Sequence, residues 1–342
     1  MSGPFLEVLH RVLRRENLDP ESAREAMLAI LDGELNPTLT VAFTVALKMK
    51  GETEEELTGF ARAMRERVTR VEVDHTPGPL LDTCGTGGEG PRTFNISTIA
   101  ALVAAGAGVR VAKHGNRSLS SLCGSADLME ALGIRIPTDP AEMSHSIRQT
   151  GIGFLFAPAL HPAMWHVQPI RRELKTRTVF NLLGPLTNPA GAKRQLIGAP
   201  SEHTARLMAH ALASLNAEFA YVVHGSDGID EVTTTGSTAV FEVTPGQVVE
   251  RVWFPSDFGV PRASLDDIAG AHPEHNRAIA EAVLSGAKGP ARDIVLINAA
   301  AALIAAGVAD TPARAMRLAA ESIDSGAARN KLEQLRSLQP AR

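Results

Sequence analysis

The chain has 342 residues, of which 44% are hydrophobic and 21% are charged, and its formal net charge is −4. This composition excludes an intrinsically disordered protein, and the negative charge offers no general attraction to nucleic acid, so we expect no nucleic-acid partner. The chain has two cysteines, no signal-peptide pattern and no apolar stretch long enough to cross a bilayer. These features predict a cytoplasmic protein without structural disulfides and without a membrane partner.

Residues 1–72 are predicted to form a small helical domain. Asp19 and Asn36 each precede a proline, which is the pattern of a helix N-cap followed by proline at the first helical position. Thr53 with Glu56 three residues later predicts a capping box. The apolar positions between these caps do not follow one narrow stripe. They indicate helices buried on more than one side, against a second domain or another subunit.

From residue 73 onward, short apolar runs alternate with glycine turns and helical patterns. The runs are LLDTCG, VRVAKHG, IGFLFAP, RQLIGAP, AYVVHGSDG and TAVFEV. Most are too short and too uniformly apolar for half-exposed antiparallel strands. They predict a large α/β domain with a mostly parallel central sheet, formed by residues 73–163 and 189–342. The segment of about residues 164–188 interrupts the alternation, and we expect it to join the helical domain.

The glycine-rich turn of residues 85–90 follows the first predicted strand and precedes a helical pattern. It lacks the lysine of a nucleotide P-loop and the glycine spacing of a dinucleotide site. The residues after it add hydroxyl and amide groups where the helix dipole is positive, namely Thr93, Asn95, Ser97 and Thr98. We interpret this stretch as a phosphate cradle. Helix capping by Asn95 and Ser97 is the alternative, and both roles are compatible.

The segment KHGNRSLSSLCGS, residues 113–125, brings cations and hydrogen-bond donors to the end of the second predicted strand. Lys113 and Arg117 supply positive charge, while Asn116 and the serines supply directed donors. The glycine and serine content is typical of a loop that closes on substrate. A polar surface loop is the alternative, and His114 by itself is more often structural than catalytic.

The adjacent carboxylates Asp230 and Glu231 follow the apolar run AYVV and lie in a predicted loop. In a loop both side chains are able to reach one hard cation, and Mg²⁺ prefers carboxylate oxygen. The alternative is a solvated acidic pair. A pyrophosphate site elsewhere in the chain would need a counter-ion, which favours the magnesium interpretation.

Arg171 and Arg172 precede the apolar, proline-punctuated segment TVFNLLGPLTNP. A guanidinium beside an apolar wall suits a planar aromatic carboxylate, because it pairs with the anion through two hydrogen bonds while the wall takes the ring. Surface salt bridging is the alternative. The spacing alone does not choose between the two arginines.

Several of these segments together resemble, in order, the signatures of anthranilate phosphoribosyltransferases: DTCGTGGEGPRTFNIST, AKHGNRSLSSLCGSAD, FAPALHPAM, TVFNLLGPLTNPA, HGSDGIDEVTTTG and ARDIVLINAAAAL. The resemblance implies the architecture shared with pyrimidine nucleoside phosphorylases, a homodimer through the helical domain, and two Mg²⁺ ions as cofactor. It also implies a reaction. The phosphoribosyl group of 5-phosphoribosyl 1-diphosphate passes to the amine of anthranilate, and diphosphate is released, in the second step of tryptophan synthesis.

The resemblance also implies site residues. The phosphoribosyl diphosphate site would comprise Gly85, Gly88, Glu89, Thr93, Asn95, Ile96, Ser97, Thr98, Lys113, His114, Gly115, Asn116, Arg117, Ser118, Leu119, Ser120, Ser121 and Ser125. Anthranilate would contact Gly85, His114, Asn116, Arg171 and Pro185, which chooses the first arginine of the pair. Magnesium would be held by Ser97, Asp230 and Glu231. The chain departs from the family pattern at Glu89, where Asp is usual, and at Arg92, Leu122 and Cys123.

No side chain is expected to act as a covalent nucleophile. The aryl amine of anthranilate is neutral at pH 7 and needs no strong base, so catalysis would rest on positioning and electrostatic stabilisation. A pyrimidine nucleoside phosphorylase of the same fold is the enzymatic alternative. A non-catalytic, nucleic-acid-binding relative is the alternative from another class.

Overall fold

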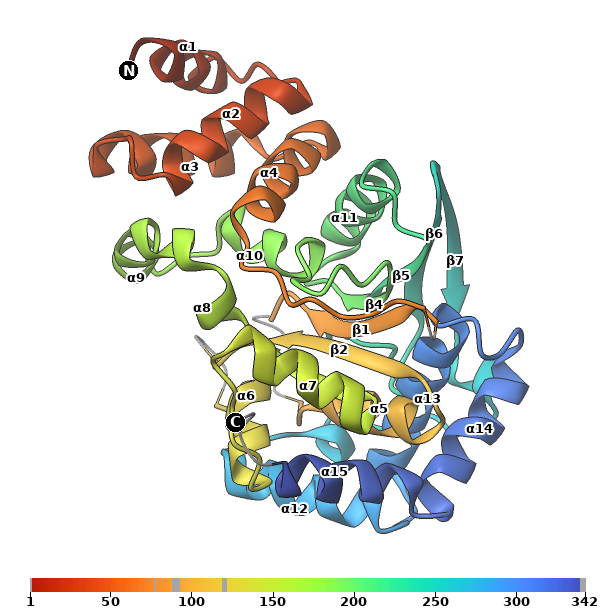
Figure 1. Cartoon of the computed structure of the whole chain (residues 1–342). Helices are drawn as coiled ribbons and strands as arrows, with labels where there is room; N and C mark the ends of the chain where they lie inside the picture. Colours follow the sequence, from red (N-terminus) through yellow and green to blue (C-terminus); the bar gives the residue numbers. More distant parts are fainter. Residues whose placement is uncertain (1, 77, 88–92, 119–121, 339–342) are drawn as a thin grey trace.

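The computed structural model describes residues 2–76, 78–87, 93–118 and 122–338. Within them, one seven-stranded sheet has the order β3-β2-β1-β4-β5-β6-β7 (Figure 1). The strands are β1 (Leu80–Gly85), β2 (Arg110–Gly115), β3 (Ile152–Phe156), β4 (Arg194–Gly198), β5 (Phe219–Gly225), β6 (Thr238–Thr244) and β7 (Gln247–Trp253). Neighbours from β3 to β5 are parallel, and β6 and β7 are antiparallel additions. The predicted mostly parallel sheet is confirmed; β7 was not predicted.

The strand order reverses at β1, which has β2 on one side and β4 on the other. Open parallel sheets leave a crevice beyond the strand ends at such a reversal, and ligands bind there. Gly85 of β1 is paired in register with Gly198 of β4 at this point. The glycine-rich turn therefore begins at the position in the sheet where a ligand site is expected.

The N-terminal helices are α1 (Ser2–Leu13), α2 (Pro20–Leu31), α3 (Pro37–Lys50) and α4 (Glu54–Arg67). All the predicted caps are present. Asp19 accepts hydrogen bonds from the first turn of α2, Asn36 accepts one from Thr38, and Thr53 and Glu56 complete both halves of the capping box. The rings of Phe5, Phe43 and Phe60 pack together between these helices.

A short helical stretch after β3 lies between the N-terminal helices and the sheet (Figure 1). It comprises α8 (Ala157–Leu160), the 3₁₀ turn η1 (Pro162–His166), α9 (Gln168–Leu174), α10 (Phe180–Leu183) and the 3₁₀ turn η2 (Gly184–Leu186). Val167, Phe180 and Leu183 share an apolar cluster with the N-terminal helices. This packing is what the predicted return of the chain to the helical domain requires, although the division into domains stays a prediction.

The remaining helices are α5 (Ile96–Gly106), α6 (Ser125–Ala131), α7 (Pro140–Thr150), α11 (Glu202–Ser214), α12 (Pro273–Leu284), α13 (Pro290–Ala305), α14 (Pro312–Asp324) and α15 (Ala327–Ser337), with the 3₁₀ turns η3 (Pro255–Phe258) and η4 (Asp266–Ile268). Of these helices, α5, α7, α11 and α13 pack on the sheet and the others pack mainly on helices. Helix α5 is buried on nearly every side because it packs against β1, β2, α13 and α15, which accounts for its uniformly apolar sequence. No helix in the described ranges is long and apolar enough to cross a membrane.

Candidate active site

Three residues from distant parts of the sequence, Ser97, Lys113 and Glu231, meet beside the carboxyl-terminal half of β1. The backbone N–H of Ser97, in the first turn of α5, donates to Glu231 Oε1 at 3.1 Å. The ammonium of Lys113, on β2, donates to the carbonyl of Thr83 and lies 3.4 Å from Ser97 Oγ. The structure therefore brings together a helix N-terminus, a hydroxyl, a carboxylate and a buried cation; their role in a phosphate and metal site stays a prediction.

The charges at this position are mutually perturbed. Burial raises the pKa of Asp230, and burial together with the neighbouring Asp230 raises the pKa of Glu231 to about 8. Burial lowers the pKa of Lys113, and the nearby Asp82 opposes this effect. With a pKa of about 8, Glu231 is mostly protonated at neutral pH, and an arriving cation would favour the ionised form of both carboxyls.

Magnesium fits the oxygen donors at this site. Asp230, Glu231 and the Ser97 hydroxyl are hard oxygen ligands, which Mg²⁺ prefers. Among the described residues there is no group of three or more His, Cys, Asp or Glu side chains that could hold a metal. Mg²⁺ that binds together with phosphates usually takes its remaining ligands from substrate phosphate and water.

The loop that carries the two carboxylates is held from two sides. Asn298, which is fully buried on α13, binds both the N–H and the carbonyl of Val232, at 2.9 and 2.8 Å. Asp227 accepts hydrogen bonds from the hydroxyls of Thr233 and Thr235. The contacts of Asn298 fix the loop to α13, and those of Asp227 are hydrogen bonds within the loop. Together they fix the part of the loop that carries Asp230 and Glu231.

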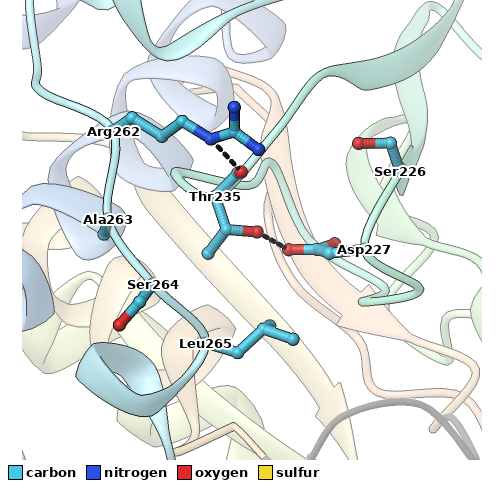
Figure 2. Close-up of a pocket in the computed structure, with 7 residues that line it drawn as sticks. All are labelled: Ser226, Asp227, Thr235, Arg262, Ala263, Ser264 and Leu265. Carbon is cyan, nitrogen blue, oxygen red and sulfur yellow. Dashed lines mark hydrogen bonds between the residues drawn. The ribbon is translucent and has the colours of Figure 1, made fainter.

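Figure 2 shows the outer side of this loop, where Thr235 lies between Arg262 and Asp227. Arg262 donates to the Thr235 carbonyl at 2.6 Å, and the Thr235 hydroxyl donates to Asp227. These residues line a surface pocket together with Ser226, Ala263, Ser264 and Leu265. Asp230 and Glu231 do not line this pocket, so it is not the candidate site itself. Its lining residues Arg262 and Asp227 hold the loop through their hydrogen bonds to Thr235.

Two glycines allow the carboxylate loop to lie against the strand ends. A Cβ atom on Gly85 would approach Asp230 Oδ2 to 2.9 Å, and one on Gly198 would overlap the Asp230 carbonyl. Both positions therefore exclude a side chain for as long as Asp230 occupies its observed place.

Some of the cradle side chains have no hydrogen-bond partner among the described residues, and others are hydrogen-bonded within the protein. Among the described residues no hydrogen-bond partner reaches the buried hydroxyls of Thr86 or Thr98. Asn95 precedes α5 but does not cap it with its side chain. Its amide instead donates to the Cys123 carbonyl and accepts from Asn276, both at 3.0 Å. Thr93 pairs with Ala269 in an isolated β-bridge, and Ile96 is buried beneath the cradle.

Several of the predicted site residues after β2 form contacts within the protein. The Ser125 hydroxyl binds both backbone groups of Asn116, at 3.1 and 3.2 Å, and so fixes the turn that follows Gly115. Arg117 forms ion pairs with Asp127 and Glu130 at an exposed position. These two carboxylates therefore largely neutralise the charge of Arg117. Ser118 is placed beside Asp127, to which its N–H donates. The predicted contacts Gly88, Glu89, Leu119, Ser120 and Ser121, and the variant position Arg92, lie outside the described residues.

The ring of His114, on β2, contacts the turn that contains Pro185. Its Nδ1 is 3.1 Å from the Gly184 carbonyl, and its Nε2 is 3.2 Å from Nε2 of His161. Since a carbonyl only accepts, Nδ1 of His114 carries the proton and His161 donates to Nε2. Burial, with His161 as a second cause, lowers the pKa of His114 to about 3, and burial lowers that of His161 to about 4. Both rings are therefore neutral at pH 7.

Arg171 and Arg172 differ in their surroundings. Arg171 is half-buried, and burial together with the nearby Arg177 lowers its pKa. In the described part of the chain, no carboxylate forms an ion pair with Arg171, whereas Arg172 is exposed to solvent. A half-buried guanidinium next to another cation is a suitable receptor for an anionic substrate. The geometry thus favours Arg171.

Sequence reasoning missed His161 and Arg177. Arg177 bonds to the carbonyls of Thr86 and Gly87 in the glycine-rich turn. Both residues stand inside or beside segments already marked as signatures, FAPALHPAM and TVFNLLGPLTNPA. Their partners lie 47 and 90 residues away in the sequence, so no local pattern could have assigned the contacts.

A comparison with protein families identifies the class. Residues 77–329 match the a/b domain of a glycosyl transferase family, and residues 6–68 match the helical bundle domain of a glycosyl transferase family. The fold and the site thus define a glycosyl transferase that joins these two domains.

Individual relatives narrow this class. The chain is 57% identical over 331 residues to the anthranilate phosphoribosyltransferase of Solibacter usitatus, covering 97% of both, and 52% identical to that of Moorella thermoacetica, covering 95% of both. The chain belongs to the anthranilate phosphoribosyltransferase family. The relatives support this identity and not that of a pyrimidine nucleoside phosphorylase.

Solved structures agree. The anthranilate phosphoribosyltransferase of Thermus thermophilus superimposes with a TM-score of 0.90 at 44% identity, covering 96% of this chain and 98% of that one. The Saccharomyces cerevisiae enzyme, in complex with PRPP and Mg, has a TM-score of 0.89 at 29% identity, covering 98% and 97%. The same yeast enzyme in complex with 4-fluoroanthranilate has a TM-score of 0.86 at 29% identity, covering 98% of both chains.

Proposed function

We propose that the chain transfers the phosphoribosyl group of 5-phosphoribosyl 1-diphosphate to the amine of anthranilate and releases diphosphate. The observation that carries this proposal is the meeting of Ser97, Lys113 and Glu231 beside the carboxyl-terminal half of β1. That cluster offers a cation, a helix N-terminus and metal-binding oxygens to a diphosphate. The half-buried Arg171 offers a second, separate anion receptor to the carboxylate of anthranilate.

On the donor side, Ser97, Asp230 and Glu231 would hold Mg²⁺, with two ions as the proposed number. Bound magnesium supplies Lewis-acid stabilisation of the charge on the departing diphosphate. Lys113 adds a fixed positive charge that is already desolvated, so no solvent has to reorganise as the bond breaks. The unpartnered hydroxyls of Thr86 and Thr98 are donors that the phosphate oxygens would satisfy.

On the acceptor side, Arg171 pairs with the carboxylate of anthranilate, while Gly85, His114, Asn116 and Pro185 form the walls. Both ring nitrogens of His114 are already engaged by Gly184 and His161. His114 therefore acts as a wall of the pocket and not as a general base. The neutral aryl amine attacks without prior deprotonation, so catalysis rests on holding the amine in line with the anomeric carbon.

A homodimer through the helical domain belongs to this proposal, as does a cytoplasmic location. Exposed apolar side chains on the N-terminal helices and on η1 support the dimer. Met49 on α3 is 71% exposed and Trp165 on η1 is 78% exposed, and Leu13 and Val45 are exposed on α1 and α3. A Met49→Glu variant should elute as a monomer in size-exclusion chromatography with light scattering. The control is Val252→Glu, at an exposed apolar residue of β7, and this variant should remain a dimer. A monomeric wild-type protein would refute the proposed homodimer.

The activity is tested by following anthranilate fluorescence. The purified chain should consume anthranilate only when 5-phosphoribosyl 1-diphosphate and Mg²⁺ are both present. Uridine with inorganic phosphate should give no free base. Phosphorolysis of a pyrimidine nucleoside, or unchanged anthranilate fluorescence under all conditions, would contradict the proposed reaction.

A further inference from the structure

Arg177 extends from a backbone segment that is fixed on both sides of it. The segment connects α9 to α10. The N–H of Lys175 donates to the Arg171 carbonyl at 3.2 Å, and the N–H of Thr178 donates to Asn181 Oδ1 at 3.1 Å. Lys48 of α3 also donates to the Thr176 hydroxyl. The Arg177 side chain therefore starts from a well-defined position.

The guanidinium of Arg177 binds the first residues of the glycine-rich turn. One terminal nitrogen donates to the Gly87 carbonyl, and the other lies 3.5 Å from the Thr86 carbonyl. Because one planar guanidinium contacts both carbonyls and a peptide group rotates as a rigid unit, the Thr86–Gly87 peptide is held in one orientation.

The peptide between Thr86 and Gly87 connects Arg177 to the carboxylate loop. Its carbonyl lies 3.5 Å from a guanidinium nitrogen of Arg177, and its N–H, on Gly87, is directed toward Asp230 and lowers the pKa of that carboxyl. The same turn lies against Asp230 at Gly85, where a Cβ atom would come within 2.9 Å of Asp230 Oδ2. Gly87 has a φ of +68°, a left-handed conformation that favours glycine, and the Thr86 N–H donates to the Gly198 carbonyl at 3.1 Å. A reversal of this peptide would turn a carbonyl toward Asp230, where negative charge is already concentrated.

The positive charge of Arg177 also favours the ionised form of Asp230. Although burial is the larger effect and raises the pKa of Asp230, Arg177 opposes that rise. Arg177 also lies close enough to Arg171 to lower its pKa. Arg177 therefore lies within electrostatic reach of both the proposed metal ligand and the proposed anthranilate receptor.

We propose that Arg177 is a positioning residue of the donor site, which holds the Thr86–Gly87 peptide with its N–H toward Asp230 and thereby keeps this carboxylate oriented for magnesium and diphosphate. It acts through the glycine-rich turn and needs no contact with substrate. This inference rests on the proposed role of Asp230 in the donor site.

The first test is hydrogen–deuterium exchange on the substrate-free protein, in peptides that contain Gly87. Exchange should be slow in the wild type and in Arg172→Gln, the matched control at the exposed neighbouring arginine. It should be clearly faster in Arg177→Gln. Arg177→Lys keeps the charge but does not hold two carbonyls at once, so intermediate exchange is expected. This readout needs no turnover, and its failure is therefore distinguishable from failure of the proposed reaction.

The second test is kinetic. Arg177→Gln should raise the KM for 5-phosphoribosyl 1-diphosphate by about tenfold or more, as expected for the loss of hydrogen bonds to a charged group. It should also weaken Mg²⁺ binding in calorimetric titration, while the KM for anthranilate rises less than that for 5-phosphoribosyl 1-diphosphate and the melting temperature changes little. Unchanged Gly87 exchange, an equal effect in Arg172→Gln, or a loss of activity explained entirely by a lower melting temperature would overturn the proposal.

Discussion

The backbone N–H of Ser97 donates to the carboxylate of Glu231 at 3.1 Å, across 134 residues of sequence. This bond joins the N-terminus of α5, which belongs to the phosphate cradle, to the loop that follows β5. The same residue presents its hydroxyl 3.4 Å from Lys113. Ser97 therefore connects the cradle, the carboxylate pair and the buried cation, and the donor site depends on all three being held together.

A Ser97→Ala variant separates the two contributions of this residue. The backbone bond to Glu231 remains, but the hydroxyl proposed as a magnesium ligand is lost. We expect a weaker apparent affinity for Mg²⁺ with a melting temperature close to that of the wild type. Mg²⁺ titration of the initial rate checks this, and an unchanged Mg²⁺ requirement would remove Ser97 from the metal site.

Gly198→Ala tests the contact between β4 and the carboxylate loop. The new Cβ would overlap the Asp230 carbonyl, so the loop has to move. Gly85→Ala meets only the Asp230 side chain, at 2.9 Å, which has more freedom to turn away. We therefore expect a larger loss of turnover and of Mg²⁺ binding in Gly198→Ala than in Gly85→Ala. The reverse order in calorimetry and rate measurements would contradict this arrangement.

Arg171→Ala should raise the KM for anthranilate by roughly 10- to 100-fold, because a charge-assisted hydrogen bond to the carboxylate is lost. The KM for 5-phosphoribosyl 1-diphosphate should change far less. Arg172→Ala, at the exposed neighbour, is the control and should behave as the wild type. Steady-state kinetics with each substrate varied in turn distinguishes the two arginines. Equal effects of the two substitutions on the KM for anthranilate would contradict the assignment of Arg171 as the receptor.

The pair of buried histidines predicts how stability changes in acid. His114 and His161 have folded-state pKa values of about 3 and about 4, below the ordinary value of 6.5. The unfolded chain therefore takes up protons first as the pH falls. The stabilisation is fully present above about pH 6.5 and is lost as the pH falls toward 4 and 3.

His161→Gln checks this account, because glutamine still donates to His114 but does not titrate. Below pH 6.5, the free energy of unfolding should fall less steeply in the variant, by at most about 1.4 kcal/mol per pH unit. Urea denaturation at a series of pH values measures the two slopes. The same acid dependence in both proteins would show that His161 is not held neutral.

The sequence predicted most strands because their apolar runs are uniform and end in glycine. It missed β7, an edge strand whose side chains are largely exposed and whose pattern QVVERVW is mixed. The cradle was predictable because Gly85 and Ser97 are close in sequence. Tertiary contacts were not: Asn95 was predicted as a ligand residue, but its side chain joins Asn276 to the Cys123 carbonyl. Arg177 was missed for the same reason.

The central claim is that Asp230 and Glu231 hold the magnesium that transfer of the phosphoribosyl group requires. Asp230→Asn combined with Glu231→Gln keeps the shape of both side chains and removes both charges. The decisive measurement is the rate of anthranilate fluorescence loss with 5-phosphoribosyl 1-diphosphate as Mg²⁺ is increased, for the wild type and the double variant. The account predicts a saturable Mg²⁺ dependence in the wild type and loss of most turnover in a folded double variant. A double variant with the wild-type rate and Mg²⁺ dependence would contradict it.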